Sequence, residues 1–133
     1  MKKNKKTGSK PQSKKTPAMP GSWYYMAQEV VTLEQLKGCV DEAGYEVEYW
    51  EDAGVLEITA GEKCSVDVEA ETGGLEDEFS QAYLAEHQVQ SVYYVSLPAD
   101  RFEECRPVLE CILEKTGGML CADSEDFTPV LKG

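Results

Sequence analysis

The sequence predicts an α+β fold: an antiparallel three-stranded meander extended by a strand–helix–strand unit, with the helices packed on one face of the sheet. Three observations favour this class. Polar and apolar residues alternate across much of the segment 45–71, as in strands that bury one face. Stretches with helical spacing of apolar residues lie on both sides of this segment. Glycine-containing turns separate the stretches from one another.

Charge divides the chain into two parts. Residues 1–25 hold seven lysines and no acid, whereas the remaining residues hold six basic and 25 acidic residues, a net charge of −19. Residues 1–22 have too few apolar side chains to offset the entropy of ordering them. We therefore expect residues 1–22 to be a disordered lysine-rich tail and residues 23–133 to be a single acidic α+β domain.

The first ordered elements follow the tail. The Trp-Tyr-Tyr-Met segment at 23–26 is expected to be a short strand or an aromatic clip on the sheet. Thr32 and Gln35 have the spacing of a capping box, and Gly44 is suited to end the helix that they begin. Between these signals the apolar residues recur at helical spacing: Leu33, Leu36, Val40 and Ala43.

The meander is expected over residues 45–50, 55–59 and 64–71. Its third strand has the cleanest two-residue period, with Cys64, Val66 and Val68 directed inward and the acidic residues directed to water. The turns contain Gly54 and Gly61. One face of the meander is therefore predicted to be apolar and the other to carry carboxylates.

A strand–helix–strand unit is expected next, after a weaker helix at 75–87. Residues 91–97 are apolar or aromatic at almost every position, which indicates an interior strand. Asp100 and Glu103 have capping-box spacing for a helix in which Pro107 predicts a kink or a break. Gly117 and Gly118 close this helix before a strand at 119–122. Such a unit predicts a right-handed parallel crossover.

The outward residues of the meander are the candidate partner-binding site. Like charges opposite one another on neighbouring strands are destabilising, and Lys63 is the only cation in the meander. This imbalance indicates a face maintained for a basic protein partner, with Trp50 as an aromatic anchor or, alternatively, as a cover beneath the second helix. The residues are Glu46, Glu48, Trp50, Glu57, Asp67, Glu69 and Glu71.

No catalytic residue, cofactor site or metal site is predicted. His87, the chain's only histidine, is interpreted as a surface residue at a helix end, and Cys121 as a buried strand residue. The five cysteines show no ligand spacing. The acidic stretches 76–78 and 123–126 are interpreted as solvated turns, since neither has the ligand register of a calcium loop.

The lysine-rich tail is the one basic segment. Lysines without arginine or aromatic neighbours give attraction that is sensitive to salt and blind to sequence, so nucleic acid or an anionic surface is a candidate partner through the tail only. No apolar stretch follows the first lysines, which argues against a secretory signal and a membrane span. The expected lack of a signal and of a membrane span, together with cysteines that are expected to be reduced, predicts a cytoplasmic location. The oligomeric state is left open.

Two stretches resemble known bacterial proteins. From Ser91 to Leu131, the apolar strand, the helix ending in Gly117-Gly118 and the run from Asp123 to Phe127 and Pro129 resemble small bacterial proteins, among them the immunity proteins of contact-dependent and polymorphic toxin systems. The helix and strands of VTLEQLKGCVDEAGYEVEYWEDAGVLEI are similar in shape to secretion chaperones.

The resemblance to immunity proteins implies a non-enzymatic binding protein that neutralises a toxin. Two alternatives remain at this point. One is a dimeric secretion or assembly chaperone, which would present an apolar groove to its client. The other is a small enzyme of unrecognised chemistry, which would present a deep pocket lined by Cys121 or by clustered acids.

Overall fold

The computed structural model describes residues 19–70 and 73–132. In this part of the chain the strands are β1 (Ser22–Ala27), β2 (Val47–Trp50), β3 (Val55–Gly61), β4 (Cys64–Ala70), β5 (Ser91–Ser96), β6 (Met119–Ala122) and β7 (Val130–Lys132). The helices are α1 (Leu33–Glu42), α2 (Glu78–Glu86) and α3 (Phe102–Thr116), the last preceded by a 3₁₀ turn, η1 (Ala99–Arg101).

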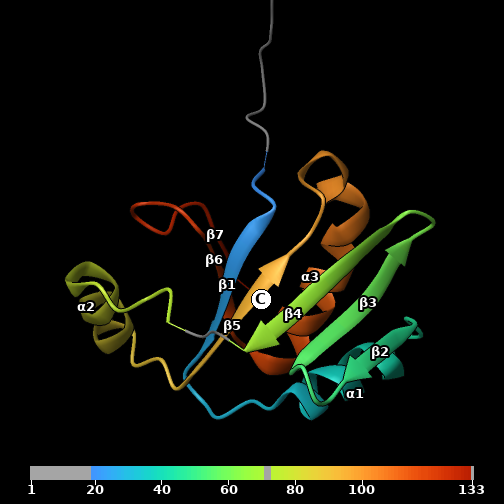
Figure 1. Cartoon of the computed structure of the whole chain (residues 1–133), viewed down its shortest axis with the longest axis horizontal. Coiled ribbons are helices and arrows are strands. Elements are labelled where there is room, and N and C mark those ends of the chain that lie inside the picture. The colour runs from blue at the N-terminus through green and yellow to red at the C-terminus, as the bar shows by residue number, and fades with distance from the viewer. Residues whose placement is uncertain (1–18, 71–72, 133) are drawn as a thin grey trace, which may run out of the picture.

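The described strands form one antiparallel sheet in the order β2-β3-β4-β5-β1-β6-β7 (Figure 1). The α+β class is therefore confirmed, and β2, β3 and β4 are neighbours in chain order, as in the predicted meander. The sequence did not predict β7, which is three residues long and pairs with β6 at the edge of the sheet.

Strand β1 lies in the interior of the sheet. It pairs with β5 on one side and with β6 on the other, and both of its faces are buried. The strand begins at Ser22, where the predicted tail ends, and Met19 already packs against the core. The predicted disorder of residues 1–18 falls outside the described residues.

The strands of the β5-α3-β6 unit lie further apart in the sheet than the predicted crossover implied, because another strand separates them. Both β5 and β6 are antiparallel to β1, so they run in the same direction. They are not neighbours, however, because β1 lies between them. The N-terminal strand thus fills the gap that the crossover leaves open.

Helix α1 begins as its capping signal predicts. The Gln35 backbone N–H donates to Thr32 Oγ1 at 3.1 Å, and the Thr32 backbone N–H donates to Gln35 Oε1 at 2.8 Å. These two bonds satisfy N–H groups that a helix otherwise leaves without partners at its first turn. The apolar side of the helix then buries Leu33, Leu36 and Val40.

Helix α3 differs from its prediction at its start and at Pro107. Asp100 lies in η1, and no side chain caps α3, so the predicted capping box is absent from this described segment. The helix continues through Pro107 without a break. Pro107 is exposed, so water can bond the carbonyl that its missing N–H would have bonded. Gly117, at φ +75°, ends the helix as predicted.

The prediction that the helices pack on one face is wrong for α2. Helices α1 and α3 cover one face of the sheet, here called the helical face, over a core that includes Trp23, Tyr25 and Leu36. Side chains of α2 pack instead with Tyr24 and Met26 on the other face, here called the outer face. In Figure 1, α2 lies accordingly at the opposite end of the sheet from α1. This arrangement covers one half of the outer face and leaves the β2-β3-β4 half uncovered.

Candidate functional site

The uncovered half of the outer face carries the predicted carboxylates. Inward residues such as Tyr49, Leu56 and Val68 pack into the core of the helical face, so their chain neighbours point the other way. Six predicted site residues are brought together on this side, and we call them the acidic surface: Glu46, Glu48, Trp50, Glu57, Asp67 and Glu69. The seventh, Glu71, lies outside the described residues.

A row of three carboxylates crosses the acidic surface. Glu48 is directly opposite Glu57, and Glu57 is directly opposite Asp67. Residues in such positions have Cβ atoms about 5 Å apart, close enough for like charges to destabilise the pairing. The row continues to Ser96 on β5. Glu57 is therefore flanked by negative charge on both sides.

Trp50 stands beside this row on the edge strand β2. Its cross-strand neighbour is Val55, and Val55 is opposite Glu69. The indole is 52% exposed, although tryptophan is usually among the most buried residues. Helix α2 packs over β1 and β6 rather than over β2, so Trp50 is not the cover beneath the second helix that the alternative interpretation expected.

Cations do not offset the acidic surface within the described residues. The ion pairs of this part of the chain join Lys37 to Asp41, Arg101 to Glu104, Arg106 to Glu103 and Lys115 to Glu42. All of them lie on or beside α1 and α3. The carboxylates of the acidic surface have no basic side chain within ion-pair distance among residues 19–70 and 73–132.

Asp67 is the most perturbed carboxylate of the acidic surface. Its pKa is raised above the ordinary value of 3.8, chiefly because partial burial removes water from the carboxylate, and further because Glu57 and Glu69 are close. A hydrogen bond from Ser65 acts in the opposite direction. The Oδ1 atom of Asp67 is buried and has no hydrogen-bond partner among the described residues. The Oδ1 atom thus lacks a donor, although Ser65 bonds to the same carboxylate.

Replacing Asp67 with asparagine should change how stability depends on pH. Because the folded state holds the Asp67 proton more tightly than the unfolded state, this residue contributes stability at low pH that is lost as pH rises through the raised pKa. The stability of the Asp67→Asn variant relative to the parent should therefore rise as the pH is raised from about 4, as measured in urea titrations. A constant difference in stability between the Asp67→Asn variant and the parent across this range would contradict the prediction.

A hollow adjoins the acidic surface on the side of α1. It has a volume of about 490 Å³, and its carboxylates include Glu46, Glu48 and Glu57. Tyr45 and Val47 line it as well. Such a hollow can accept the side chain of a lysine or arginine, which brings a charged donor to several carboxylates at once.

The cysteines lie where the sequence suggested, in apolar surroundings. Cys64, Cys105 and Cys121 are buried, and the described cysteines form no disulfide. The Cys121 thiol is fully buried, 3.6 Å from Tyr83 Oη and 3.8 Å from Met26 Sδ, and burial raises its pKa. Burial beside Cys64 raises the pKa of Cys105 to about 12. These thiols are poor nucleophiles.

The acidic turns have local structural roles. Asp77 caps α2 by accepting hydrogen bonds from the backbone and the hydroxyl of Ser80, and these bonds lower its pKa. Asp126 accepts bonds from Thr128 in the loop before β7, again with a lowered pKa. Among the described residues, no group of three or more histidine, cysteine, aspartate or glutamate side chains is placed to hold a metal ion.

His87 has surroundings that the sequence did not predict. It caps the C-terminal end of α2 and lines a separate hollow that also contains Lys132 of β7. These residues are 45 positions apart in the chain, and β7 itself was not predicted. Their juxtaposition could have been inferred only after β7 had been placed beside β6.

No family model, no curated protein and no solved structure matches this chain. In the part of the chain that the structure describes, no helix is both long enough and apolar enough to cross a membrane.

Proposed function

We propose that this chain is a non-enzymatic binding protein whose acidic surface docks onto a cationic surface of another protein. The observation that carries the proposal is the row formed by Glu48, Glu57 and Asp67, in which like charges are directly opposed. Within the described residues, no basic side chain forms an ion pair with these carboxylates. A basic partner would relieve this repulsion.

The acidic surface has the components of a protein interface. Trp50 offers an exposed aromatic anchor of the kind that dominates binding energy, and the surrounding carboxylates would speed association with a cationic partner. The hollow beside Glu46 and Glu48 would receive one basic side chain from that partner. The expected contact is thus an aromatic anchor surrounded by charge pairs.

A toxin-neutralising immunity protein is the role that we favour for this surface. The sequence resemblance between residues 91 and 131 implies it, and covering a cationic surface of a toxin would require the chemistry that the acidic surface offers. The free thiols of the described cysteines are consistent with action in a reducing compartment such as the cytoplasm.

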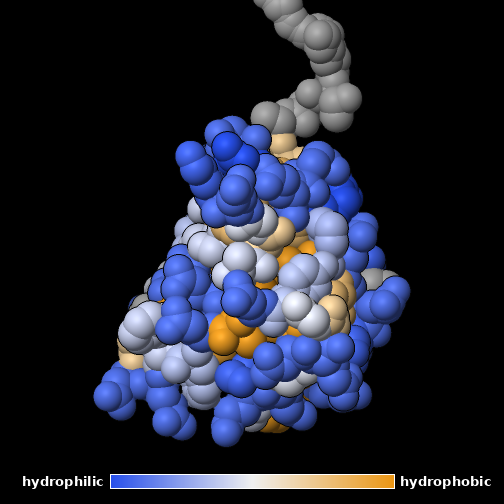
Figure 2. Space-filling view, turned by 90° about the vertical axis from the view of Figure 1, so that its right-hand side faces the viewer, coloured by the Kyte–Doolittle hydropathy of each residue, from blue (hydrophilic) through white to orange (hydrophobic). Residues whose placement is uncertain are grey.

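The two alternatives have less support. A client groove would need continuous apolar surface, whereas the exposed large apolar residues of the described chain are Val30, Trp50 and Phe79, from three separate segments. On the side shown in Figure 2, hydrophilic residues surround small hydrophobic areas. An enzyme based on Cys121 would need an accessible thiol, and this thiol is buried.

A cationic probe peptide tests the proposal on the full chain. A peptide of alternating lysine and valine should change the fluorescence of the exposed Trp50 and shift the amide NMR signals of Glu48, Glu57 and Asp67 in a saturable way. Trp23 is fully buried, so the change in fluorescence reports chiefly on Trp50. Association should slow at least about tenfold when these three acids are replaced by Gln, Gln and Asn.

Two controls accompany this measurement. The same peptide with glutamate in place of lysine should not bind. A chain with Glu34, Glu110 and Glu114 changed to glutamine loses equal charge from exposed positions of α1 and α3, and it should associate with the lysine peptide nearly as fast as the parent. Equal slowing in both triple variants would show that net charge alone matters, and the proposed docking surface would be rejected.

A further inference from the structure

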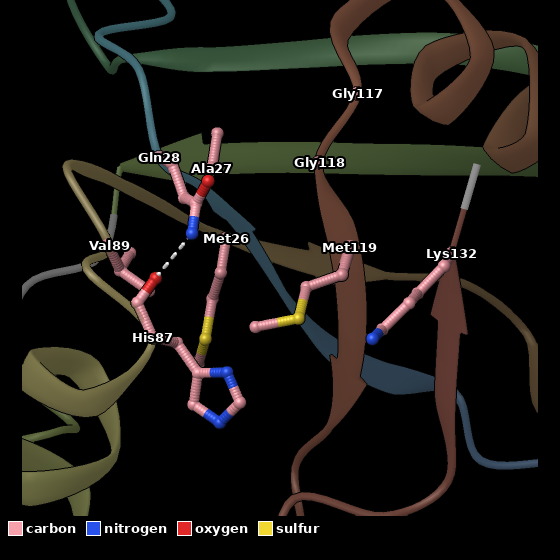
Figure 3. A pocket seen from close by; sticks show the side chains of 9 residues that line it. All are labelled: Met26, Ala27, Gln28, His87, Val89, Gly117, Gly118, Met119 and Lys132. Atoms are coloured by element: carbon pink, nitrogen blue, oxygen red, sulfur yellow. Dashed lines mark hydrogen bonds between the residues drawn. The ribbon is translucent and has the colours of Figure 1, made fainter.

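A second hollow lies at the opposite end of the outer face from the acidic surface. It has a volume of about 240 Å³ and is bounded by the sheet on one side and by the end of α2 on the other. From the sheet come Met26, Met119 and Lys132, and from the end of α2 and the residues after it come His87 and Val89 (Figure 3).

The strand register places three of these side chains in one row. Met26 of β1 is opposite Met119 of β6, and Met119 is opposite Lys132 of β7. Directly opposed residues project from the same face of a sheet, so all three point to the outer face. Met26 is buried and forms the floor, whereas Lys132 is exposed at the rim. The floor of the hollow is therefore made of thioethers and its outer rim carries an ammonium group.

His87 reaches the hollow from the other side. Its position is held by the Gln28 side-chain amide, which donates to the His87 carbonyl at 3.0 Å, and by the Tyr83 ring, whose centroid is 4.2 Å from that of the imidazole. Figure 3 shows the imidazole and the Lys132 ammonium group on either side of Met119. Two nitrogen donors thus border an apolar floor.

Both donors lack a protein partner within the described chain. Lys132 has no carboxylate within ion-pair distance there, and neither has Lys63, whereas the other described lysines and arginines each have one. No hydrogen bond to either ring nitrogen of His87 occurs among these residues. A lysine and a histidine thus face the hollow without a carboxylate partner among residues 19–70 and 73–132.

We propose that this hollow binds a small organic carboxylate with a short apolar chain. The Lys132 ammonium and an imidazole N–H of His87 would hold the carboxylate oxygens, and Met26, Met119 and Val89 would contact the apolar chain. A carboxylate suits the site better than a phosphate, because the apolar floor matches a hydrocarbon and no arginine lines the hollow. The acidic surface lies on β2, β3 and β4, four to six strands from Lys132 on β7, where salt screens its effect at physiological ionic strength.

The histidine provides a reporter for this proposal. His87 is the only histidine of the chain, so its ring Cε1–H group gives a single NMR signal. Titration of the full chain with hexanoate should shift this signal in a saturable way. Hexanol should shift it less and bind at least about tenfold more weakly, because it lacks the charge that Lys132 and His87 would hold. Inorganic phosphate should also bind more weakly than hexanoate.

A pair of lysine variants completes the experiment. Lys132→Met should weaken hexanoate binding at least about tenfold, since it removes the charged donor from an exposed position without opening the core. Lys63→Met makes the same change at the turn between β3 and β4, and it should leave the titration unchanged. Tighter binding of phosphate or hexanol than of hexanoate, no saturable shift, or equal binding by the Lys132→Met variant and the parent would each overturn the proposal. None of these outcomes bears on the acidic surface, which the lysine–valine peptide tests separately.

Discussion

Removing residues 1–25 is expected to abolish cooperative folding, whereas removing residues 1–18 is expected to preserve it. The first deletion takes away most of β1, including Trp23, Tyr24 and Tyr25, and leaves β5 and β6 without the strand that joins them. Truncating one buried tryptophan commonly costs about 3–5 kcal/mol, and the whole stability of a domain is about 5–15 kcal/mol. Losing several buried aromatic residues and two strand pairings exceeds that margin.

The measurement is a urea titration followed by near-ultraviolet circular dichroism. The parent and the chain that begins at Met19 should each show one sigmoidal transition, because residues 1–18 have too few apolar side chains to add to a core. The chain that begins at Met26 should show none. As a graded control, Trp23→Ala should unfold cooperatively but at lower urea, since it removes only the indole, its packing on Phe102 and its bond to the Pro20 carbonyl. A sigmoidal transition for the chain beginning at Met26 would refute the central role assigned to β1.

Replacing Glu57 with lysine is expected to stabilise the fold and to weaken binding of a cationic probe at the same time. The change turns two repulsive neighbours, Glu48 and Asp67, into attractive ones. Each cross-strand pair of this kind is worth about 0.2–1 kcal/mol, so the free energy of unfolding should rise by about 1 kcal/mol. The same change places a positive charge where the partner's cations are expected to dock, so association should slow by more than about tenfold.

Two further variants test whether the changes in stability and association rate come from the charge at position 57. Glu57→Gln should lie between the parent and Glu57→Lys in both stability and association rate, because it removes repulsion without adding attraction. Glu125→Lys makes the same charge reversal at an exposed loop position, and it should give little change in stability. If Glu57→Lys were less stable than the parent, the carboxylate row would not be under electrostatic strain, and the reason for proposing a basic partner would fall away.

Features set by neighbouring residues could be predicted from the sequence. The capping box of α1, the glycine that ends α3 and the two-residue alternation of β2, β3 and β4 each depend on contacts within a few positions. That alternation alone placed Glu48, Glu57 and Asp67 on one face. The absence of nearby cations then followed from the sequence, because the meander contains only Lys63.

Features set by distant pairing could not be predicted. A short segment such as 22–27 is apolar on both faces, and nothing local says that its partners are β5 and β6. Where α2 lies on the outer face, its Tyr83 packs on Phe127, a loop residue that comes 44 positions later in the chain. The hollow between His87 and Lys132 exists only because β1 lies inside the sheet and α2 lies on the outer face. It could therefore not be predicted from the sequence.

The interior position of β1 also bears on how the protein is made. The ribosome synthesises β1 early, but the Tyr25 hydroxyl bonds to Thr116, 91 residues later in the chain, and Met26 contacts Cys121, 95 residues later. Until β6 leaves the ribosome, the Trp-Tyr-Tyr-Met segment of β1 lacks one of the two strands that it pairs with. Long separations of this kind slow folding and leave apolar strands open to wrong partners. The β1 segment therefore stays without its two strand partners until β5 and β6 have been synthesised.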